Sequence, residues 1–314
     1  MKAVRFHEYG DPDVLRYEDV EQPVPAAGQV RIRVAATSFN GVDANIRGGG
    51  MRGPIPVELP HTPGIDVAGT VDALGEGVST VAVGDAVVGF LPMVADGAAA
   101  EYVLAPAEIL APAPTSIPLA DAAALPIVAL TAWQALFDHG GLQAGQRVLV
   151  NGAGGAVGGH AVQLARSAGA HVIATASPNS RARVLAAGAD EVVDHTSTDV
   201  TAAVGEPVDL VLNLAPVEPA QLDALVAVVR PGGVLVNTTV WMPAPSDEER
   251  GVRGIDLFVR SDAAQLSELV ARVDRGELHV DIAERVPLAE LPAVHGRAGA
   301  GALSGKVVVL APAD

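Results

Sequence analysis

The sequence predicts an α/β protein with a doubly wound parallel sheet and a second, discontinuous, β-rich domain that forms a partly open barrel. Between residues 120 and 260, short apolar runs alternate with helical segments, a spacing typical of parallel sheets. On both sides of this region, short alternating or β-branched runs are separated by Gly and Pro, which is typical of strands and turns. We therefore expect the β-rich domain at 1–119 and 261–314 and the parallel sheet at 120–260.

Composition and charge narrow the classes of function. The chain has 314 residues, a net charge of −17 and no cysteine, so it offers neither disulfides nor the thiolate ligands of structural zinc. The negative charge repels nucleic acid and anionic membranes. The first residues lack the apolar segment of a signal peptide, and no apolar run approaches the ~18 residues of a membrane span. We expect a cytoplasmic protein with no nucleic-acid or membrane partner.

The β-rich domain is expected to contain strands and turns, and no helix before residue 118. Apolar alternation marks the strands, and clusters of Gly and Pro separate them. The expected strands are Met1–Phe6, Val14–Glu18, Gln29–Ala36, Asp66–Ala73, Val81–Phe90 and Ala98–Leu104. Strand character returns between Leu278 and Leu310, which predicts that this tail rejoins the domain.

The central region is expected to alternate buried strands with helices. Its strands are expected at 148–150, 171–176, 191–194, 208–212, 233–240 and 255–260. Helices are expected at 120–125, 127–137, 180–187 and 222–229, with one more over 263–275. Strands that alternate with helices at this spacing pair in parallel.

One segment organises the central region, and it reads RVLVNGAGGAVGGHAVQLARSA from Arg147 to Ala168. A buried strand leads into a glycine-rich turn and then into a helix. The turn has the spacing Ala153-x-Gly155-x-x-Gly158. This is a variant of the dinucleotide fingerprint, whose small residues permit a sharp turn, close approach of a pyrophosphate and close packing of helix on strand. The helix N-terminus adds unpaired N–H groups and the positive end of its dipole.

The order of these motifs resembles the medium-chain dehydrogenase/reductase superfamily, and within it the zinc-independent, NADPH-dependent quinone oxidoreductases of the zeta-crystallin type. The resemblance spans the whole chain and rests on VLVNGAGGAVGGHAVQLAR, AAGADEVVDH, VRPGGVLV and GKVVVL. It implies a Rossmann nucleotide-binding domain and a GroES-like substrate domain. The zinc enzymes of the superfamily have cysteine at the position of Asn40 and Gly-His-Glu at the position of Gly64-Ile65-Asp66, so the resemblance implies a site without metal.

The end of the second parallel strand predicts NADPH as the cofactor. An acidic residue at this point reads the ribose hydroxyls of NAD, whereas this chain has Ser177, followed by Ser180, Arg181 and Arg183. Hydroxyl and guanidinium groups suit a 2′-phosphate. Of the two arginines we favour Arg181, because it stands at the expected helix start; the alternative is that both are solvated.

The resemblance also implies individual contacts. Asn40, Asp43 and Thr131 are the expected catalytic residues, and the Asn40 amide is expected to donate to the anion formed on the substrate, although an Asn beside Gly41 also fits an ordinary turn. His195 is expected near the adenine, and the alternative is a solvated loop histidine. Asn40 is expected to orient a nicotinamide carboxamide, a ribose hydroxyl or a substrate carbonyl, and Thr131 is expected at the nicotinamide region. Asn213, at the carboxyl end of the fourth strand, is expected to contact the cofactor ribose. The other expected cofactor contacts are Gly152, Ala153, Gly155, Ala156, Val157, Gly158, Ser177, Arg181, Leu214, Thr238, Phe258 and Val259.

The histidines do not predict a metal site, because no pair has the i, i+4 or finger spacing of ligands. His61 is the histidine expected near the cleft. The leading hypothesis is hydride transfer from NADPH to a quinone or another conjugated enone. Two alternatives stay open: a catalytically weak NADPH-binding sensor or structural protein, and a reductase of simple ketones or aldehydes, which lacks the Lewis acid that zinc would supply.

The expected last strand also bears on assembly. In the superfamily the outer strand of the nucleotide domain often pairs across a two-fold axis. Here the segment from Gly254 to Arg260 presents an apolar edge with few charges to deter such pairing. The sequence therefore predicts a homodimer.

Overall fold

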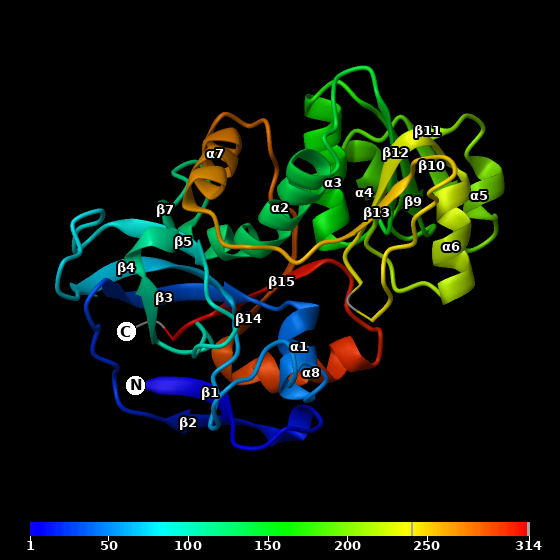
Figure 1. Ribbon diagram of the computed structural model, residues 1–314. Helices are drawn as coiled ribbons and strands as arrows, with labels where there is room; N and C mark the ends of the chain where they lie inside the picture. The colour runs from blue at the N-terminus through cyan, green and yellow to red at the C-terminus, as the bar shows by residue number, and fades with distance from the viewer. Residues whose placement is uncertain (240, 313–314) are drawn as a thin grey trace. The chain divides into compact units, whose positions relative to one another are not determined.

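The computed structural model describes residues 1–239 and 241–312, and the chain divides into two compact units (Figure 1). Unit 1 comprises residues 1–127, 261–276 and 280 onward, and unit 2 comprises residues 128–260 and 277–279. The predicted fold class is confirmed: a six-stranded parallel Rossmann sheet accompanies an antiparallel, β-rich GroES-like domain. The boundary falls at Ile127 rather than at residue 119, because the 3-10 helix Leu119–Ala124 packs on the strands of unit 1 and buries its alanines there.

Unit 1 contains a seven-stranded sheet and a two-stranded sheet. The larger sheet has the order β14-β15-β3-β4-β5-β7, and β6 pairs with the first half of β3. Apart from the parallel pair β14 and β15, its neighbours are antiparallel. The strands are β1 (Lys2–Phe6), β2 (Leu15–Asp19), β3 (Gln29–Ser38), β4 (Asp66–Leu74), β5 (Ala86–Phe90), β6 (Tyr102–Pro106), β7 (Leu110–Pro112), β14 (Ile282–Pro287) and β15 (Lys306–Leu310).

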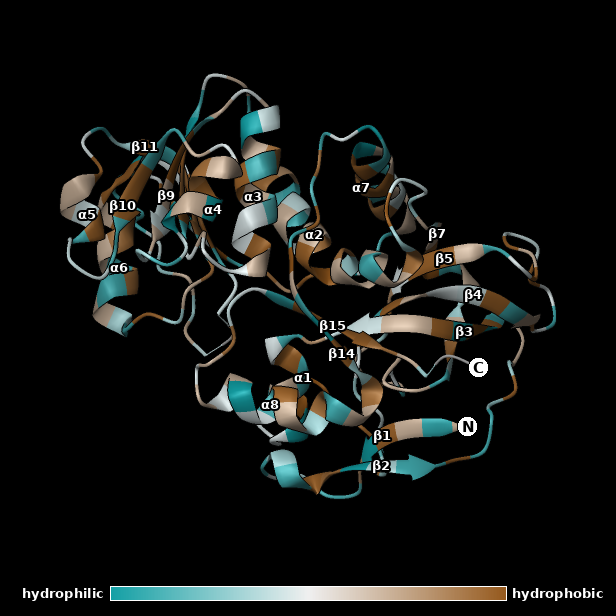
Figure 2. Cartoon of the chain, turned by 180° about the vertical axis from the view of Figure 1, so that it is seen from behind, coloured by the Kyte–Doolittle hydropathy of each residue, from teal (hydrophilic) through white to brown (hydrophobic). Residues whose placement is uncertain are grey.

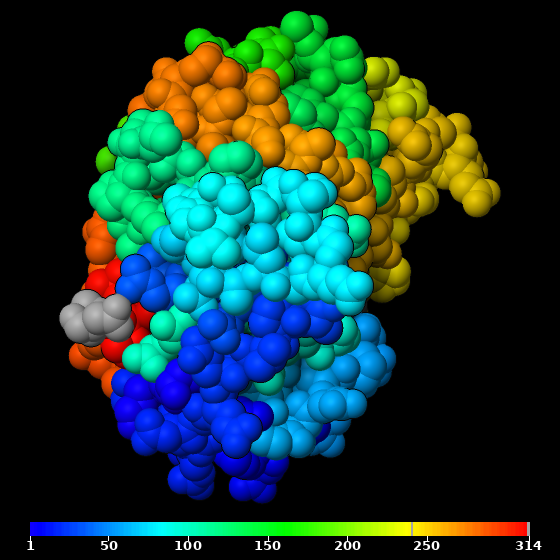
Figure 3. Space-filling view, turned by 90° about the vertical axis from the view of Figure 1, so that its left-hand side faces the viewer, coloured from blue at the N-terminus to red at the C-terminus, as the bar shows by residue number. Residues whose placement is uncertain are grey.

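Two apolar clusters hold unit 1 together. One contains buried residues of β3, β4 and β5, such as Ile32, Val67 and Val87, and in the first part of β3 these alternate with more exposed neighbours, as in a half-buried strand. The other packs Phe6 of β1 against residues of the helices α1 (Gly41–Arg47) and α8 (Leu291–Gly299). A third helix, α7 (Ala263–Asp274), packs against β7. The loop between β4 and β5 is largely exposed and lies at the surface in Figure 3 (cyan).

Unit 2 is built on one parallel sheet with the order β10-β9-β8-β11-β12-β13. Its inner strands β8, β9 and β11 are almost fully buried and apolar, which is why β9 and β11 are largely brown in Figure 2, while the helices that pack on the sheet carry polar outer faces. The strands are β8 (Arg147–Asn151), β9 (His171–Ala176), β10 (Glu191–Asp194), β11 (Val208–Asn213), β12 (Val229–Asn237) and β13 (Arg253–Asp256). The helices are α2 (Pro126–Trp133), α3 (Ala156–Ser167), α4 (Arg181–Ala186), α5 (Val200–Ala203) and α6 (Pro219–Ala227).

The expectation of strands and turns alone was wrong for two segments of unit 1. α1 begins directly after Asn40, whose backbone N–H donates to the carboxylate of Asp43 at 3.3 Å, a bond that caps the helix. α8 begins with Pro292 in its first turn, where proline is well tolerated. In unit 2, the last strand ends at Asp256 and not at Arg260. The homodimer expected from this edge stays a prediction.

No helix within the described residues is long and apolar enough to cross a membrane.

Unit 1 buries two ionisable side chains on its helices, Arg47 on α1 and His295 on α8. His295 of α8 is 1% exposed, and neither ring nitrogen has a hydrogen-bond partner. Its ring meets Phe39 edge to face, with centroids 4.9 Å apart. Burial, together with the positive charge of Arg47, lowers the pKa of His295 to about 3. The folded protein therefore holds His295 neutral, although an unfolded chain binds a proton there below about pH 6.5.

This difference predicts acid sensitivity. Between pH 6.5 and 3 the unfolded chain binds more protons at His295 than the folded chain, so the free energy of unfolding falls by roughly 1.4 kcal/mol for each pH unit lost within this range. The variant His295→Leu should show a shallower fall than the wild type between pH 7 and 5 in urea unfolding. The exposed His279→Gln is the control and should keep the wild-type slope. Parallel curves for His295→Leu and the wild type would contradict the assignment.

Candidate cofactor site and buried polar network

The glycine-rich turn of unit 2 has the geometry that its sequence predicts. Gly152 has a φ of +94°, a conformation that favours glycine. Gly158 lies against the turn so closely that a Cβ there would stand 2.5 Å from the Cα of Ala153. Gly155 is the N-cap of α3, so the N–H groups of Ala156 and Val157 begin the helix without helical partners. This combination suits an anionic group such as a pyrophosphate.

A cavity of about 700 Å³ opens at the carboxyl ends of β8, β9 and β11. This is the end of a doubly wound sheet at which ligands bind. Gly152 contributes to its wall, and so does the exposed His195, which the resemblance places near the adenine. The sequence did not single out Thr198, Asp199 and Thr201, which also line the cavity. Asp199 is the N-cap of α5 and accepts from the backbone N–H of Thr201, so the start of this short helix shapes one wall.

The serines after β9 face the glycine-rich turn. Ser180 Oγ accepts from the backbone N–H of Ser177 at 3.1 Å, and a Cβ on Gly154 would meet this Oγ at 2.6 Å. The two arginines diverge. Arg183 Nη2 donates to the Gly154 carbonyl at 2.6 Å, whereas Arg181 Nη1 donates to Val192 at 3.2 Å. The structure thus places Arg183 beside the turn and Arg181 against β10, and the expected role of Arg181 at a 2′-phosphate stays a prediction.

Asn213 does not offer its side chain to a ligand. The residue is 0% exposed, its Nδ2 donates to Ala215 and Asn237, and its Oδ1 accepts from Asn151. The expectation of a direct contact between this amide and the cofactor ribose is therefore wrong for this arrangement, because the residue is fully buried and both N–H groups of its amide already donate. Leu214 lies next to Gly152, and its N–H donates to the carbonyl of Asn151 at 2.8 Å.

The other expected contacts of unit 2 lie on α2 and on the loops that follow β12 and β13. Thr131 is 8% exposed on α2, and Phe258 is 55% exposed. Thr238 donates from both its N–H and its Oγ1 to the carbonyl of Asn213. Val259 lies beyond the end of β13, as Phe258 does. Their contacts with a cofactor stay predictions.

In unit 1, the residues expected to be catalytic belong to a buried polar network around Asp66. This carboxylate is 0% exposed and accepts hydrogen bonds from Ser38 Oγ at 2.6 Å and from Asn40 Nδ2 at 2.9 Å. It also accepts at 3.3 Å from Lys306 Nζ, a residue 240 positions later in the chain. The same ammonium donates to Asn40 Oδ1. The network thus joins β3, β4 and β15 to the start of α1.

The oxygen and both N–H groups of the Asn40 amide already have partners within this network. Its Oδ1 accepts from Lys306, and its Nδ2 donates to Asp66 and to the Ser38 carbonyl. The expectation that Asn40 donates to a substrate anion is therefore wrong for this arrangement. The side chain instead aligns the ammonium and the carboxylate with each other.

Asp43 and Lys306 have opposite pKa shifts with the same main cause. Burial raises the pKa of Asp43 to about 7, although the N–H of Gly64, which donates at 2.9 Å, and the N–H of Asn40 act in the other direction. Burial also lowers the pKa of Lys306, while Asp66 opposes the shift. The chain has only two lysines, Lys2 and Lys306. The GKVVVL motif therefore also indicates a buried acidic partner, because a lysine is rarely buried in an apolar strand unless it is paired.

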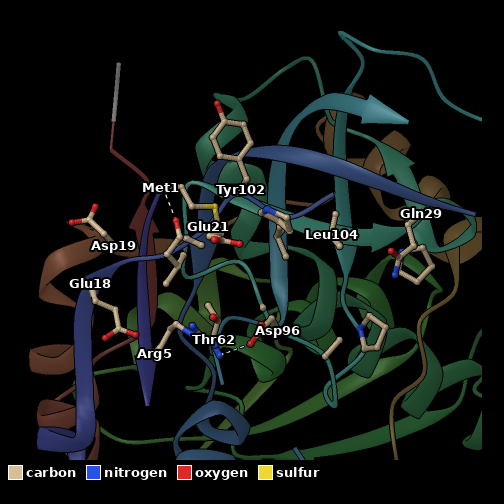
Figure 4. Close-up of a pocket in the computed structure, with 18 residues that line it drawn as sticks. Met1, Arg5, Glu18, Asp19, Glu21, Gln29, Thr62, Asp96, Tyr102 and Leu104 are labelled. Atoms are coloured by element: carbon tan, nitrogen blue, oxygen red, sulfur yellow. Dashed lines mark hydrogen bonds between the residues drawn. The ribbon is translucent and has the colours of Figure 1, made fainter. Parts of the chain in front are cut away.

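A second cavity, of about 720 Å³, lies in unit 1 and contains none of the predicted site residues (Figure 4). Most of its charged lining is acidic: Glu18, Asp19, Glu21 and Asp96, opposed by Arg5. Such a lining does not suit an apolar, conjugated acceptor. His61 lies beside it, 4% exposed, with Nδ1 3.8 Å from Asp96, and burial lowers the pKa of this histidine.

Comparison with known proteins gives consistent results across the chain. Residues 26–115 match the family described as Alcohol dehydrogenase GroES-like domain, and residues 187–309 match Zinc-binding dehydrogenase. The quinone oxidoreductase of Lama guanicoe is 34% identical, covering 99% of this chain and 97% of the llama protein. The solved quinone oxidoreductase from Coxiella burnetii is 29% identical with a TM-score of 0.89 and covers 99% of both chains. A mycobacterial protein solved in complex with NADPH is 29% identical with a TM-score of 0.86, covering 99% of this chain and 100% of that one.

The zinc named in the second family description does not fit the residues present. Asn40 stands where the zinc enzymes have cysteine, and a cationic side chain, Lys306, already lies against it. Ile65 stands where they have histidine. Among residues 1–239 and 241–312, no group of three or more histidines or acidic residues is arranged to hold a metal ion. These donors therefore do not form the catalytic zinc site of those enzymes.

The buried network predicts a strong dependence of stability on Lys306. The variant Lys306→Met leaves Asp66 buried without its cation, and breaking a buried pair in this way costs about 3–5 kcal/mol. Chemical denaturation should therefore give a lower free energy of unfolding by roughly that amount. Lys2→Met is the matched control, because it removes the other lysine, whose exposed pair with Asp19 is screened by water. If the two variants were equally stable, the role of the network would be refuted.

Proposed function

Because the chain belongs to the medium-chain dehydrogenase/reductase superfamily of oxidoreductases, which use nicotinamide dinucleotides, we propose that it is an NADPH-dependent reductase of quinones or other α,β-unsaturated carbonyls. The proposal of NADPH rests on one observation above all: Ser177, Ser180 and Arg183 cluster beside the glycine-rich turn where an acidic reader of the ribose would stand. The proposal of the acceptor rests on the relatives named quinone oxidoreductases.

Unit 2 would hold the cofactor through three parts of its polar edge. The first N–H groups of α3, at Ala156 and Val157, would bind the pyrophosphate. The cavity beside His195 would enclose the adenosine half. Arg183 and the serines after β9 would bind the 2′-phosphate by charge-assisted hydrogen bonds. The net charge of −17 makes such a local cationic group necessary for a ligand with several phosphates.

The chemistry we propose requires positioning and little else from the protein. When bound, NADPH supplies the hydride. A quinone or enone that accepts it carries a delocalised anion, which needs less stabilisation than the localised alkoxide of a simple ketone. The Asn40 amide does not provide that stabilisation, because Lys306 and Asp66 already engage it. We therefore assign to the network the rigid support of β3 and α1, and to solvent the delivery of the proton.

The first prediction concerns the cofactor. NADPH should bind much more tightly than NADH, and Arg183→Ala should weaken NADPH binding by about 1.5–3 kcal/mol, the contribution of a hydrogen bond to a charged group. NADH lacks the 2′-phosphate, so its affinity should barely change. Arg181→Ala is the control and should have the smaller effect on NADPH. Titration calorimetry measures these dissociation constants, and equal affinities of the wild type for both cofactors would refute the proposal.

The second prediction concerns the reaction. With NADPH labelled by deuterium at C4, the label should appear on the β-carbon of an enone acceptor, as mass spectrometry can show. Chelators should leave the rate unchanged. A rate that falls on chelation and returns with zinc would contradict the proposed mechanism. An enzyme that binds NADPH but oxidises it with no quinone or enone of a panel would instead support the sensor alternative.

A further inference from the structure

Five polar residues stand at one level across the parallel sheet of unit 2. Asn151, Asn213, Asn237 and Asp256 are the last residues of β8, β11, β12 and β13, and the strand register pairs each with the next. The register of β8 and β9 pairs Val150 with Ala174, and Thr175, the next residue, bonds to Asn151. We call these residues the asparagine ladder.

A single chain of hydrogen bonds runs through the asparagine ladder. Thr175 Oγ1 donates to Asn151 Oδ1 at 3.0 Å, and Asn151 Nδ2 donates to Asn213 Oδ1 at 2.8 Å. Asn213 Nδ2 donates in turn to Asn237 Oδ1 at 2.9 Å. All four side chains are at most 5% exposed. Every donor points the same way, so the bond dipoles add and strengthen one another.

The two ends of the ladder fix its direction. At one end the backbone N–H of Gly152, which can only donate, bonds to Thr175 Oγ1 at 2.8 Å. At the other end Asn237 Nδ2 donates to the backbone carbonyls of Thr239 at 3.1 Å and Met242 at 2.8 Å, groups that can only accept, and Asp256 Oδ1 lies 3.4 Å from the same nitrogen. No single amide can rotate by 180° without placing two acceptors or two donors face to face.

The ladder also holds the loops that follow the strands. Asn213 Nδ2 donates to the carbonyl of Ala215, and Asn237 Nδ2 donates to the carbonyls of Thr239 and Met242. Ala215 and Gly152 both line the cavity of unit 2. A chain of buried amides thus ends on the first glycine of the cofactor turn and on a wall of the same cavity.

We propose that the asparagine ladder positions the cofactor turn, with Asn213 as its central member and Thr175 as its link to Gly152. The inference rests on the proposed function, because the group positioned is the NADPH-binding turn. These residues are positioning residues: none needs to touch the cofactor, and each acts by holding the turn in its binding conformation before the cofactor arrives.

The decisive variant is Asn213→Asp, which keeps the shape but, when ionised, removes the two N–H groups that donate to Asn237 and Ala215. A protonated aspartic acid can accept from Asn151 and donate to Asn237, whereas the ionised form turns an oxygen towards the Asn237 oxygen. The ratio of the NADPH dissociation constants of variant and wild type should be at least about ten at pH 8.5, where the ionised form has lost both donated hydrogen bonds. The ratio should be lower at pH 6, where the protonated acid again donates to Asn237, though not to Ala215. Gln143→Glu, an exposed site in unit 2, makes the same charge change and should give a ratio near one at both pH values.

Thr175→Val provides a test that involves no titration. It removes the acceptor of the Gly152 N–H, so NADPH should bind about tenfold more weakly at both pH values. Hydrogen exchange at the Gly152 amide, followed by NMR without cofactor, should show protection in the wild type and its loss in Thr175→Val. In Asn213→Asp the protection should return as the pH falls.

The outcomes separate the two proposals. A wild type that does not bind NADPH would refute the proposed function, while protection of Gly152 would still support the ladder as the support of that turn. A wild type that binds NADPH, together with an Asn213→Asp ratio that does not change with pH, would overturn the ladder. Wild-type affinity and Gly152 protection in Thr175→Val would overturn it as well.

Discussion

The need to pair buried amides governs the edge of unit 2 on which the candidate site is built. Asn151, Asn213 and Asn237 end three neighbouring strands whose other inward residues are apolar, and a buried amide without partners costs about 1–3 kcal/mol. Here each amide finds its partner on the next strand, because the parallel register brings all three to the same level. The sheet can therefore end in polar groups without losing stability. The glycine-rich turn and the cavity wall both depend on that pairing.

In unit 1 the buried polar groups are paired mainly through charge, between an ammonium and a carboxylate. Lys306 and Asp66 are buried together, and Asn40 bonds to both. Replacing such a pair with apolar groups is often neutral for stability, so its presence is better explained by the geometry it imposes. It ties strands far apart in sequence to the start of α1. The position at which the zinc enzymes of this superfamily have a cysteine is thus occupied here by an amide that supports a salt bridge.

Local patterns in the sequence predicted most of the fold, and long-range pairs explain most of the errors. The strand, turn and helix around Gly158 could be predicted because every contact involved lies within a few residues. The use of the Asn40 amide could not, since its partner Lys306 lies 266 residues away. Arg181 and Arg183 differ by half a helical turn, and only the position of Gly154 distinguishes them.

The asparagine ladder did leave a signal in the sequence. The runs VLVN, LVLN and VLVN each end at an asparagine, at Asn151, Asn213 and Asn237. Three apolar strands that each end in a buried asparagine indicate that these side chains pair between strands. Considered alone, Asn213 was predicted to contact a ligand. Only the strand order shows that it is the middle member of a series of hydrogen bonds.

Hydrogen exchange by mass spectrometry, with and without NADPH, tests most directly whether the polar edge of unit 2 is the cofactor site. Binding should slow exchange in the peptides that cover 152–158, the turn and the start of α3, and 177–183, the serines and Arg183. The peptides of β3 and β4 should change less. Protection elsewhere, with no change at 152–158, would contradict the account.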